Sequence, residues 1–362
     1  MRETASVFFC NYSVGTQVCR QVPELCRPYG TRALLIGGER AMAAGLPKLE
    51  AALAGGKLEI VQAVKFGKDC TARQSERWAR YAKELGADMI FGMGGGKALD
   101  TAKNAAFRAG LPVFTFPTIA ATCAGTTALS VVYREDGSFD HFAFYPRPAR
   151  HCFIDLDILA RAPWRYLQAG MGDTMGKFFE CHFAARGDKL AHSSALGREI
   201  SNMCYAPLQE HGIQALADCR AGKATHALEQ AVLANIVSTG LVSLLVLDEY
   251  NCAIAHSVYY GLVLLPGFEE KHLHGNVVAY GVLVQLAVDR DWERARELKA
   301  LLRKLDIPTT LGEMGVALDR DHLAKVLRET VTGPDMEHIP YPVTEDMIFR
   351  AMEAVEKLQI DQ

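Results

Sequence analysis

The feature that most constrains the fold is an alternation of short apolar runs with helix-length segments through the first 117 residues. The apolar runs are RALLIG (32–37), LEIVQAV (58–64), ADMIFGM (87–93) and LPVFTFP (111–117). The helix-length segments between them cover 39–55, 72–86 and 97–110. Gly86 and Gly110 are suited to ending the last two helices, because glycine adopts the left-handed conformation common there. Strands separated in this way predict a parallel sheet of the doubly wound type.

From about residue 160 the pattern changes to helical segments alone. Apolar segments of helical length or period cover 167–186, 226–250, 253–265, 276–288, 292–305 and 342–359. A chain of 362 residues is long enough for two domains. We therefore expect an α/β domain over 1–160 and an all-α domain over 161–362, with the boundary in 157–163. Two such domains leave a cleft between them, where ligands commonly bind.

Charge and composition exclude several classes of protein. The net charge of −3 gives no electrostatic footprint for nucleic acid. The N-terminus does not read as a signal peptide, and the stretches GLVLLPGF and LVSLLVLD are too short to span a bilayer. The ten cysteines form no CxxC pair, which is typical of buried thiols in a reducing compartment; only Cys123 is considered further. We expect a cytoplasmic protein without membrane contact.

The stretch GMGGGKALD (92–100) joins the third predicted strand to a helix and suggests a phosphate site. It is not a P-loop, because that pattern needs glycine where Phe91 stands and a hydroxyl residue where Ala98 stands. It is not the GxGxxG fingerprint either, since 97–101 contain no glycine. What remains is a glycine turn before a helix N-terminus, whose unpaired N–H groups attract anions. A tight turn without a ligand is the alternative; three glycines followed by a lysine favour anion binding.

Five segments carry a resemblance to a known family. GMGGGKALDTAK resembles the GGGKxxDxAK signature of the iron-containing, or group III, alcohol and polyol dehydrogenases. FPTIAATCAGTTALSVVY resembles their second cofactor segment; GMGDTMGKFFE, AIAHSVYYGL and KHLHGNVVAYGVLVQL resemble their metal-ligand segments. The resemblance spans essentially the whole chain and is nearest to the glycerol dehydrogenase and hydroxycarboxylate dehydrogenase A branches. It implies a Rossmann-like N-terminal domain and a helical C-terminal domain, the architecture shared with dehydroquinate synthase.

The resemblance implies that Asp173, His256 and His274 bind one divalent metal. Carboxylate and imidazole ligands suit zinc, which we prefer, and also iron, nickel or manganese. Three protein ligands leave a position for a substrate oxygen, on which the metal acts as a Lewis acid, while a nicotinamide exchanges the hydride. Taken singly, Asp173 would be read as a helix N-cap, His256 as a core histidine and His274 as a loop histidine. His272 is a lesser candidate that either reaches the substrate or faces solvent.

Two residues depart from the family pattern at the site. Lys177 stands where the iron-type members carry a fourth histidine ligand, one turn after Asp173 and on the same helix face. Lys177 could pair with Asp173, snorkel into solvent, or hold a substrate carboxylate, and we favour the last. Cys123 stands where glycerol dehydrogenases carry an aspartate; a thiol removes both an anchor for glycerol and a charge that repels anions. Both changes favour a 2-hydroxy or 2-oxo acid over a polyol.

A third departure concerns the choice of nucleotide. NAD-preferring members carry an acidic residue after the first clear strand, for the adenosine ribose. Here Gly38 stands at that place and leaves room for a 2′-phosphate, with which Arg40 could pair. Glu39 could take the acidic role if the register slips by one, and Arg40 alone could be a solvated residue. We expect NADP(H), with NAD(H) as the alternative.

Further cofactor contacts follow from the resemblance alone. Gly94, Gly95 and Gly96 are expected against the pyrophosphate, with Lys97 nearby and Asp100 in the same signature. Ala121 replaces a serine found in many relatives, so only its backbone could contribute. The segment expected to lie along the cofactor towards the nicotinamide supplies Thr118, Ile119, Thr127, Leu129 and Tyr133.

These inferences predict a metal- and nicotinamide-dependent dehydrogenase of small hydroxy or oxo acids. A glycerol or other polyol dehydrogenase is the nearest alternative. A dehydroquinate synthase-like lyase would need more basic residues around the site. A non-catalytic nucleotide-binding protein is favoured only by Lys177. Relatives of this kind assemble into homo-oligomers, so we expect a homo-oligomer whose other partner is the small-molecule substrate.

Overall fold

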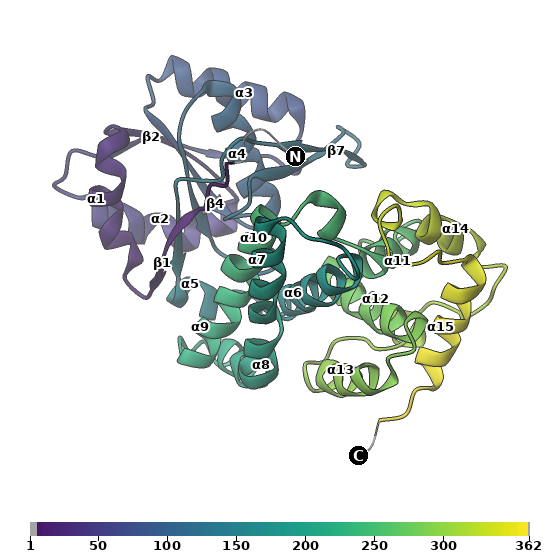
Figure 1. Cartoon of the computed structure of the whole chain (residues 1–362). Helices are drawn as coiled ribbons and strands as arrows, with labels where there is room; N and C mark the ends of the chain where they lie inside the picture. The colour runs from purple at the N-terminus through teal and green to yellow at the C-terminus, as the bar shows by residue number, and fades with distance from the viewer. Residues whose placement is uncertain (1–5, 361–362) are drawn as a thin grey trace.

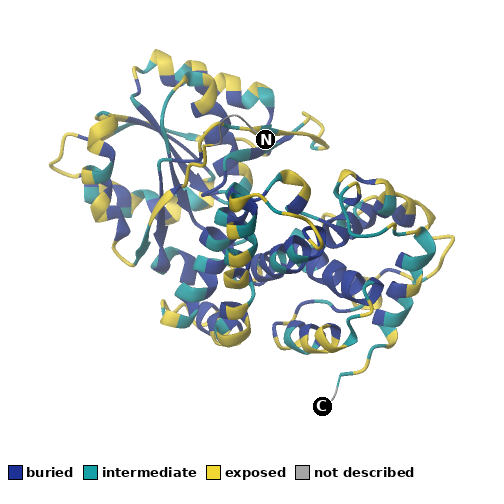
Figure 2. Cartoon of the chain, in the orientation of Figure 1, coloured by how far each residue is buried: buried dark blue, intermediate teal, exposed yellow. Residues whose placement is uncertain are grey.

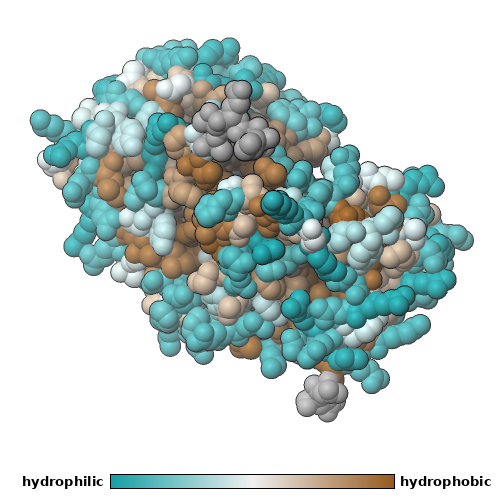
Figure 3. All heavy atoms as spheres, in the orientation of Figure 1, coloured by the Kyte–Doolittle hydropathy of each residue, from teal (hydrophilic) through white to brown (hydrophobic). Residues whose placement is uncertain are grey.

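The computed structural model describes residues 6–360 and has an α/β half followed by a helical half (Figure 1). The sheet with its helices forms one lobe, and the remaining helices form the other. Polar side chains cover most of the face shown in Figure 3, and apolar residues gather towards its centre and upper part. This arrangement confirms the predicted fold class.

The main sheet has six parallel strands in the order β1-β8-β5-β4-β2-β3. A separate antiparallel hairpin is formed by β6 and β7. The strands are β1 (Asn11–Gly15), β2 (Arg32–Gly37), β3 (Glu59–Lys65), β4 (Met89–Gly94), β5 (Val113–Pro117), β6 (Leu129–Tyr133), β7 (Phe139–Phe144) and β8 (His151–Asp155).

The four predicted strands are confirmed as β2, β3, β4 and β5, whereas β1, β8 and the hairpin were not predicted. β8 has only five residues, and β1 is a five-residue edge strand with the partly polar sequence NYSVG. Polar residues in NYSVG and at both ends of HCFID leave neither strand with the longer apolar run by which the four predicted strands were recognised. They belong to the sheet because β8 fills the position between β5 and β1.

Alternation along β2 explains how the sheet is covered on both faces. Ala33 and Leu35 pack with α1 and α2, and Leu34 and Ile36 pack with α3 and α4. Successive strand residues point to opposite faces, so a strand buried on both sides reads as a continuous apolar run. The helices of this half are α1 (Val22–Cys26), α2 (Glu39–Leu53), α3 (Ala72–Glu84), α4 (Gly96–Ala109) and α5 (Leu156–Ala160).

The helical half is built around α6 and α12, which are mostly buried (Figure 2). Its helices are α6 (Trp164–Ala184), α7 (His192–Ile200), α8 (Ala206–Arg220), α9 (His226–Leu233), α10 (Thr239–Leu245), α11 (Ile254–Leu262), α12 (His274–Val288), α13 (Trp292–Lys304), α14 (Ala324–Thr332) and α15 (Glu345–Lys357). Short 3₁₀ turns are η1 (Val18–Gln21), η2 (Arg27–Tyr29), η3 (Ser201–Cys204), η5 (Asp248–Tyr250), η6 (Gly312–Met314) and η7 (Pro334–Met336), and η4 (Ala234–Ser238) is a π turn.

The chain passes from one half to the other between β8 and α6. The last sheet strand ends at Asp155 and the first long helix begins at Trp164. The expected limit at residue 160 lies between them, and we propose it as the domain boundary.

One helical stretch lies within the predicted segment 226–250 and is markedly apolar. The continuous stretch His226–Leu245 is long and apolar enough to cross a membrane by length and composition. Two thirds of its most apolar window is buried inside the protein, which is the usual state of a core helix. The π turn within it turns the Ile236 carbonyl towards Thr126, whose hydroxyl donates to it at 2.5 Å.

Candidate metal centre and cofactor cleft

Glycines at two helix crossings set the position of the predicted metal ligands. A Cβ on Gly172 of α6 would lie 2.2 Å from the Gly275 carbonyl oxygen, and one on Gly275 of α12 would lie 1.8 Å from the Ala169 carbonyl oxygen. A Cβ on Gly281 would lie 2.3 Å from the Ala255 carbonyl oxygen of α11. Only glycine permits such contact of backbone with backbone. The three ligand-bearing helices are therefore held unusually close.

The three predicted metal ligands converge at these crossings. The Oδ1 atom of Asp173 lies 3.2 Å from Nε2 of His274 and 3.5 Å from Nε2 of His256. All three ligand atoms lie within 4.8 Å of one another. One carboxylate and two imidazole nitrogens facing a common point form a donor set that fits zinc or a similar divalent metal.

The Glu180 carboxylate supports the site from behind, and sequence reasoning missed it. Glu180 lies on α6, seven residues after Asp173, and is fully buried. Its Oε2 is 2.5 Å from Nδ1 of His256, on the opposite side of the imidazole from Asp173. Metal-binding histidines commonly have such a carboxylate partner. Burial raises the pKa of the Asp173 carboxyl, but hydrogen bonds from His256 and His274 lower it below its ordinary range, so Asp173 is ionised.

Lys177 is buried near the ligands, with its ammonium directed at Asn251. It donates to the Asn251 carbonyl at 2.6 Å and to Asn251 Oδ1 at 3.0 Å. Burial lowers the pKa of Lys177, but the negative charges of Glu180 and Asp173 raise it above its ordinary value. The structure therefore keeps a positive charge one turn after Asp173. This rules out snorkelling, because the side chain is buried.

Cys123 lies on the loop between β5 and β6 that packs against the helical half. A Cβ on Gly170 would lie 2.0 Å from the Ala120 carbonyl oxygen, and Asn235 donates to that same oxygen at 2.9 Å. Burial and the charge of Asp173 raise the pKa of the Cys123 thiol to about 11. Cys123 is therefore a neutral thiol at physiological pH, close enough to Asp173 to sense its charge.

The glycine turn between β4 and α4 is shaped for close approach of a ligand to the backbone. Gly94 has a φ of 153°, which residues with a side chain rarely adopt. A Cβ on Gly95 would lie 2.6 Å from Cδ1 of Ile119, and Gly96 begins α4. The N-terminus of α4 therefore lies beside Ile119 and has no side-chain cap. The backbone N–H of Thr118 donates to the Gly94 carbonyl at 3.0 Å and so holds the next strand end against the turn. This geometry fits the pyrophosphate of a dinucleotide.

The charged residues of the glycine signature have partners of their own. Lys97 pairs with Asp69 and lies over the Tyr133 ring at 4.6 Å. Asp100 is buried, accepts from the Val131 N–H at 3.1 Å and pairs with Lys103 at 3.0 Å. Asp100 therefore ties α4 to β6, and its direct contact with the cofactor stays a prediction.

Lys103 is a second residue that sequence reasoning missed. It is buried and donates to the Thr127 hydroxyl at 3.2 Å and to the Leu129 carbonyl. Thr127 and Leu129 are predicted cofactor contacts, so Lys103 fixes the segment that carries them. Its place in the GGGKxxDxAK signature was the available signal.

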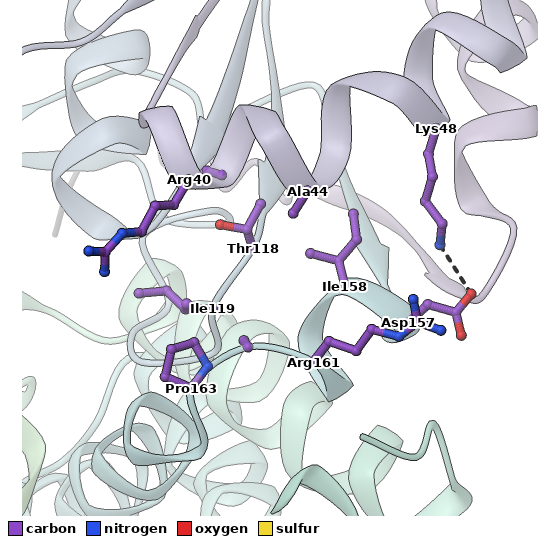
Figure 4. Close-up of a pocket in the computed structure, with 11 residues that line it drawn as sticks. Arg40, Ala44, Lys48, Thr118, Ile119, Asp157, Ile158, Arg161 and Pro163 are labelled. Carbon is purple, nitrogen blue, oxygen red and sulfur yellow. Dashed lines mark hydrogen bonds and ion pairs between the residues drawn. The ribbon is translucent and has the colours of Figure 1, made fainter. Parts of the chain in front are cut away.

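A cavity of about 480 Å³ lies at the carboxyl ends of β2, β5 and β8 (Figure 4). Figure 4 shows Arg40 on one wall, Thr118 and Ile119 beside it, and Arg161 and Pro163 opposite. Ligands of open α/β sheets bind at this edge. Gly38 precedes α2 and Glu39 pairs with Lys65 at 2.9 Å, outside the cavity lining.

His272 lies on the loop before α12. The His272 ring packs on Phe268 with ring centroids 4.5 Å apart, and the backbone N–H of His272 donates to the Phe268 carbonyl. Tyr259 lies nearer to the metal ligands, since its ring meets that of His274 edge-on at 4.3 Å. The role of His272 at the substrate stays a prediction.

Comparisons with known proteins agree with this geometry. The family described as iron-containing alcohol dehydrogenase matches residues 11–154. Glycerol dehydrogenase of Thermotoga maritima is 34% identical over 299 residues, covering 81% of this chain and 80% of that protein. Hydroxycarboxylate dehydrogenase A of Escherichia coli is 34% identical over 334 residues, covering 91% and 90%. The crystal structure of glycerol dehydrogenase from Schizosaccharomyces pombe has a TM-score of 0.89 at 26% identity, covering 98% of this chain and 91% of that one.

These similarities extend over both halves of the molecule and confirm the resemblance seen in the sequence. Members of this family use a nicotinamide cofactor and a divalent metal, for which this chain offers the cleft and the three ligands described above. The chain belongs to the iron-containing alcohol dehydrogenase family and is a nicotinamide-dependent dehydrogenase that acts on CH–OH groups.

Proposed function

We propose that this enzyme interconverts a small 2-hydroxy acid and its 2-oxo acid with NADP(H), using one zinc ion held by Asp173, His256 and His274. The observation that carries the proposal is the buried ammonium of Lys177, one turn after Asp173. A neutral Cys123 thiol stands nearby in place of a carboxylate. Together these residues favour an anionic substrate.

Lys177 has one hydrogen-bond donor left for a ligand. A lysine ammonium has three N–H groups, and those of Lys177 donate to two atoms of Asn251, its carbonyl oxygen and Oδ1. The third is available to a substrate carboxylate in a buried setting, where charge-assisted hydrogen bonds are strong. The metal, when bound, supplies a Lewis acid for the other oxygen of the substrate. Asn251 holds the ammonium in place, so a small acid is oriented without reordering the site.

Features at the other end of the cleft support NADP(H). Gly38 offers no side chain to the adenosine ribose, and Arg40 lines the cavity beside it. Glu39 is engaged by Lys65, which leaves it poorly placed to bind the ribose hydroxyls of NAD(H). An Arg guanidinium matches a phosphate well. Equal kcat/KM for the two cofactors would remove this part of the proposal.

The Lys177→Ala variant tests the choice of substrate. We expect KM for 2-oxobutyrate to rise about ten- to hundredfold, because a hydrogen bond to a charged group is worth roughly 1.5–3 kcal/mol. KM for an uncharged ketone of the same size should change little. An equal change for both substrates would contradict the role of Lys177.

Glycerol is the second candidate substrate, because similar proteins from Thermotoga maritima and Citrobacter freundii are named glycerol dehydrogenase. The reduced-nicotinamide absorbance with 2-oxobutyrate, 2-oxoglutarate and glycerol, each with both cofactors and added Zn²⁺ or Fe²⁺, separates the two. Turnover of glycerol alone would mean that Lys177 and Cys123 do not select the substrate.

The surface and the cysteines support two further proposals. Phe139, Phe142 and Phe144 are exposed side by side on β7, and exposed apolar patches commonly mark contacts between proteins. We propose a homo-oligomer, which sedimentation would test. All ten cysteines are free, which supports a reducing, cytoplasmic location.

A further inference from the structure

The most tightly held group outside the ligand triangle is the Glu180 carboxylate. It has no solvent exposure and is bound on both oxygens. Oε1 accepts the backbone N–H groups of Ala253 and His256, each at 2.8 Å. Oε2 is 2.5 Å from Nδ1 of the His256 imidazole. One side chain of α6 therefore holds both the backbone and the ring of a residue on α11.

The contacts to Oε1 cap α11 from another helix. The first N–H groups of a helix have no partner within it and are normally capped by a nearby side chain of the same segment. The N-cap residue of α11 is Ala253, which has no side-chain acceptor. Glu180 takes over that task and so fixes where α11 begins relative to α6.

The contact to Oε2 fixes a proton on Nδ1 of His256. An ionised carboxylate only accepts hydrogen bonds, so Nδ1 must be the donor. The other ring nitrogen, Nε2, faces Asp173 at 3.5 Å and is the atom that a metal would take in exchange for its proton.

We propose that Glu180 is a positioning residue: it holds the Nδ1–H group and the backbone of His256, so that Nε2 faces the metal position. The inference rests on the three-ligand metal site of the proposed function, and it deepens that site by one residue. It is independent of the choice of substrate.

The Glu180→Gln variant separates the two tasks of Glu180. The amide oxygen can still accept the N–H groups of Ala253 and His256, so the cap is kept. The amide nitrogen then faces Nδ1 and donates to it, which moves the ring proton to Nε2. The reversed amide would place a donor against two backbone donors and is therefore disfavoured. E180Q thus preserves the fold and turns a proton towards the metal position.

Asp335 provides a matched control. It is an acid near His256, but its Oδ2 has no hydrogen-bond partner within residues 6–360. Asp335→Asn removes a nearby charge without touching the imidazole hydrogen bond. E180D keeps an acceptor for Nδ1 at shorter reach.

The experiment measures the zinc affinity of the full-length protein by competition with a chelator, the melting temperature of the apoprotein, and the ring ¹⁵N shifts of His256 in the zinc-loaded protein. We expect E180Q to weaken zinc binding about 10–100-fold, with E180D between it and wild type and D335N unchanged. The apo melting temperature of E180Q should stay within a few degrees. In the zinc-loaded wild type the ¹⁵N shifts should show a protonated Nδ1 and a metal-bound Nε2.

Two results would overturn the proposal. One is wild-type zinc affinity in E180Q. The other is a zinc-loaded wild type in which Nδ1 of His256 carries no proton, a reading that needs no variant to fold. Because neither readout involves a substrate, a failure here is distinct from a failure of the substrate proposal, which the KM of the Lys177 variant reports.

Discussion

The metal site and the nucleotide site, called here the metal end and the nucleotide end, are held in place in different ways. At the metal end, three helices cross with glycine backbones in contact, and the ligands are buried or partly buried. At the nucleotide end, Arg40 and Lys97 are exposed side chains on the first turns of α2 and α4. Packing therefore fixes the geometry of the metal end, whereas individual side chains set the preference of the nucleotide end. Zinc binding at the metal end should therefore respond sharply to small changes in side-chain volume, and cofactor preference at the nucleotide end to changes in charge.

The largest effect is expected from Gly275→Ala, which adds one methyl group at the crossing of α6 and α12. Its Cβ would lie 1.8 Å from the Ala169 carbonyl oxygen, so the helices must separate. A displacement near 1 Å at a reacting centre costs on the order of a hundredfold, so zinc affinity and kcat should fall at least that far. Metal analysis and steady-state kinetics check this.

Gly212→Ala is the matched control, because a Cβ there meets nothing closer than 3.6 Å on helix α8. This variant should bind zinc as wild type does. A Gly275→Ala enzyme with full zinc occupancy would show that the crossing tolerates volume after all.

A charge at the rim of the metal end comes next in size. Cys123→Asp places a second carboxylate near Asp173, where it should repel the carboxylate of an acid substrate. Close like charges repel by a few kcal/mol even at an effective dielectric constant near 20. Activity on 2-oxobutyrate should fall on the order of tenfold or more, while activity on glycerol should rise. Cys123→Ser, which adds no charge, should change the ratio of the two activities little. A rise in oxo-acid activity with aspartate would count against the proposed substrate.

A substitution at the nucleotide end should change the preference for NADP(H) over NAD(H) without unfolding the protein. Arg40→Ala should lower the ratio of kcat/KM for NADP(H) over NAD(H) roughly five- to tenfold, because an exposed charged contact is worth little more than about 1 kcal/mol. Arg147→Ala, on an arginine that lies over Phe8 at 3.8 Å, is the control. An unchanged ratio in Arg40→Ala would mean that Arg40 does not bind the 2′-phosphate of NADP(H).

The smallest effect on activity is expected from His151, which lies in the sheet and outside both ends. Burial lowers the pKa of His151 from 6.5 to about 4. The unfolded chain therefore takes up this proton below pH 6.5, and the native state only near pH 4. Stability falls as the pH drops through that window, by up to about 3 kcal/mol. The melting temperature of His151→Phe should fall less between pH 6.5 and 4.5 than that of wild type, with kcat at pH 7.5 unchanged. Parallel melting curves would refute this.

The sequence predicted the elements that carry a strong local pattern. β2 and β4 are buried on both faces and therefore read as apolar runs, and Gly110 ends α4 with a φ of 74° as expected. β1 (NYSVG) and β8 (HCFID) were not predicted, because polar residues interrupt or bound their apolar residues. Residues 1–5 and 361–362 lie outside the part of the chain that the structure describes.

The candidate site was predictable only where the family resemblance reached. Asp173, His256 and His274 lie on three separate helices, and no local pattern shows that they meet. Glu180 is 76 residues from its partner His256, and Lys177 is 74 residues from Asn251. Spacing along α6 does put Asp173, Lys177 and Glu180 on one face, but only the crossing with α11 and α12 reveals what that face touches.

The contact of glycine backbones between α6 and α12 has a consequence for how such enzymes diversify. It makes the ligand triangle a property of the main chain, which amino-acid replacement elsewhere in the site leaves untouched. Lys177 and Cys123 stand at the rim of that triangle and can be exchanged one at a time. Under the proposed function, a lineage can explore new substrates through these two residues while it keeps the same metal ligands, and an engineer who wants a new substrate should begin with the same two positions.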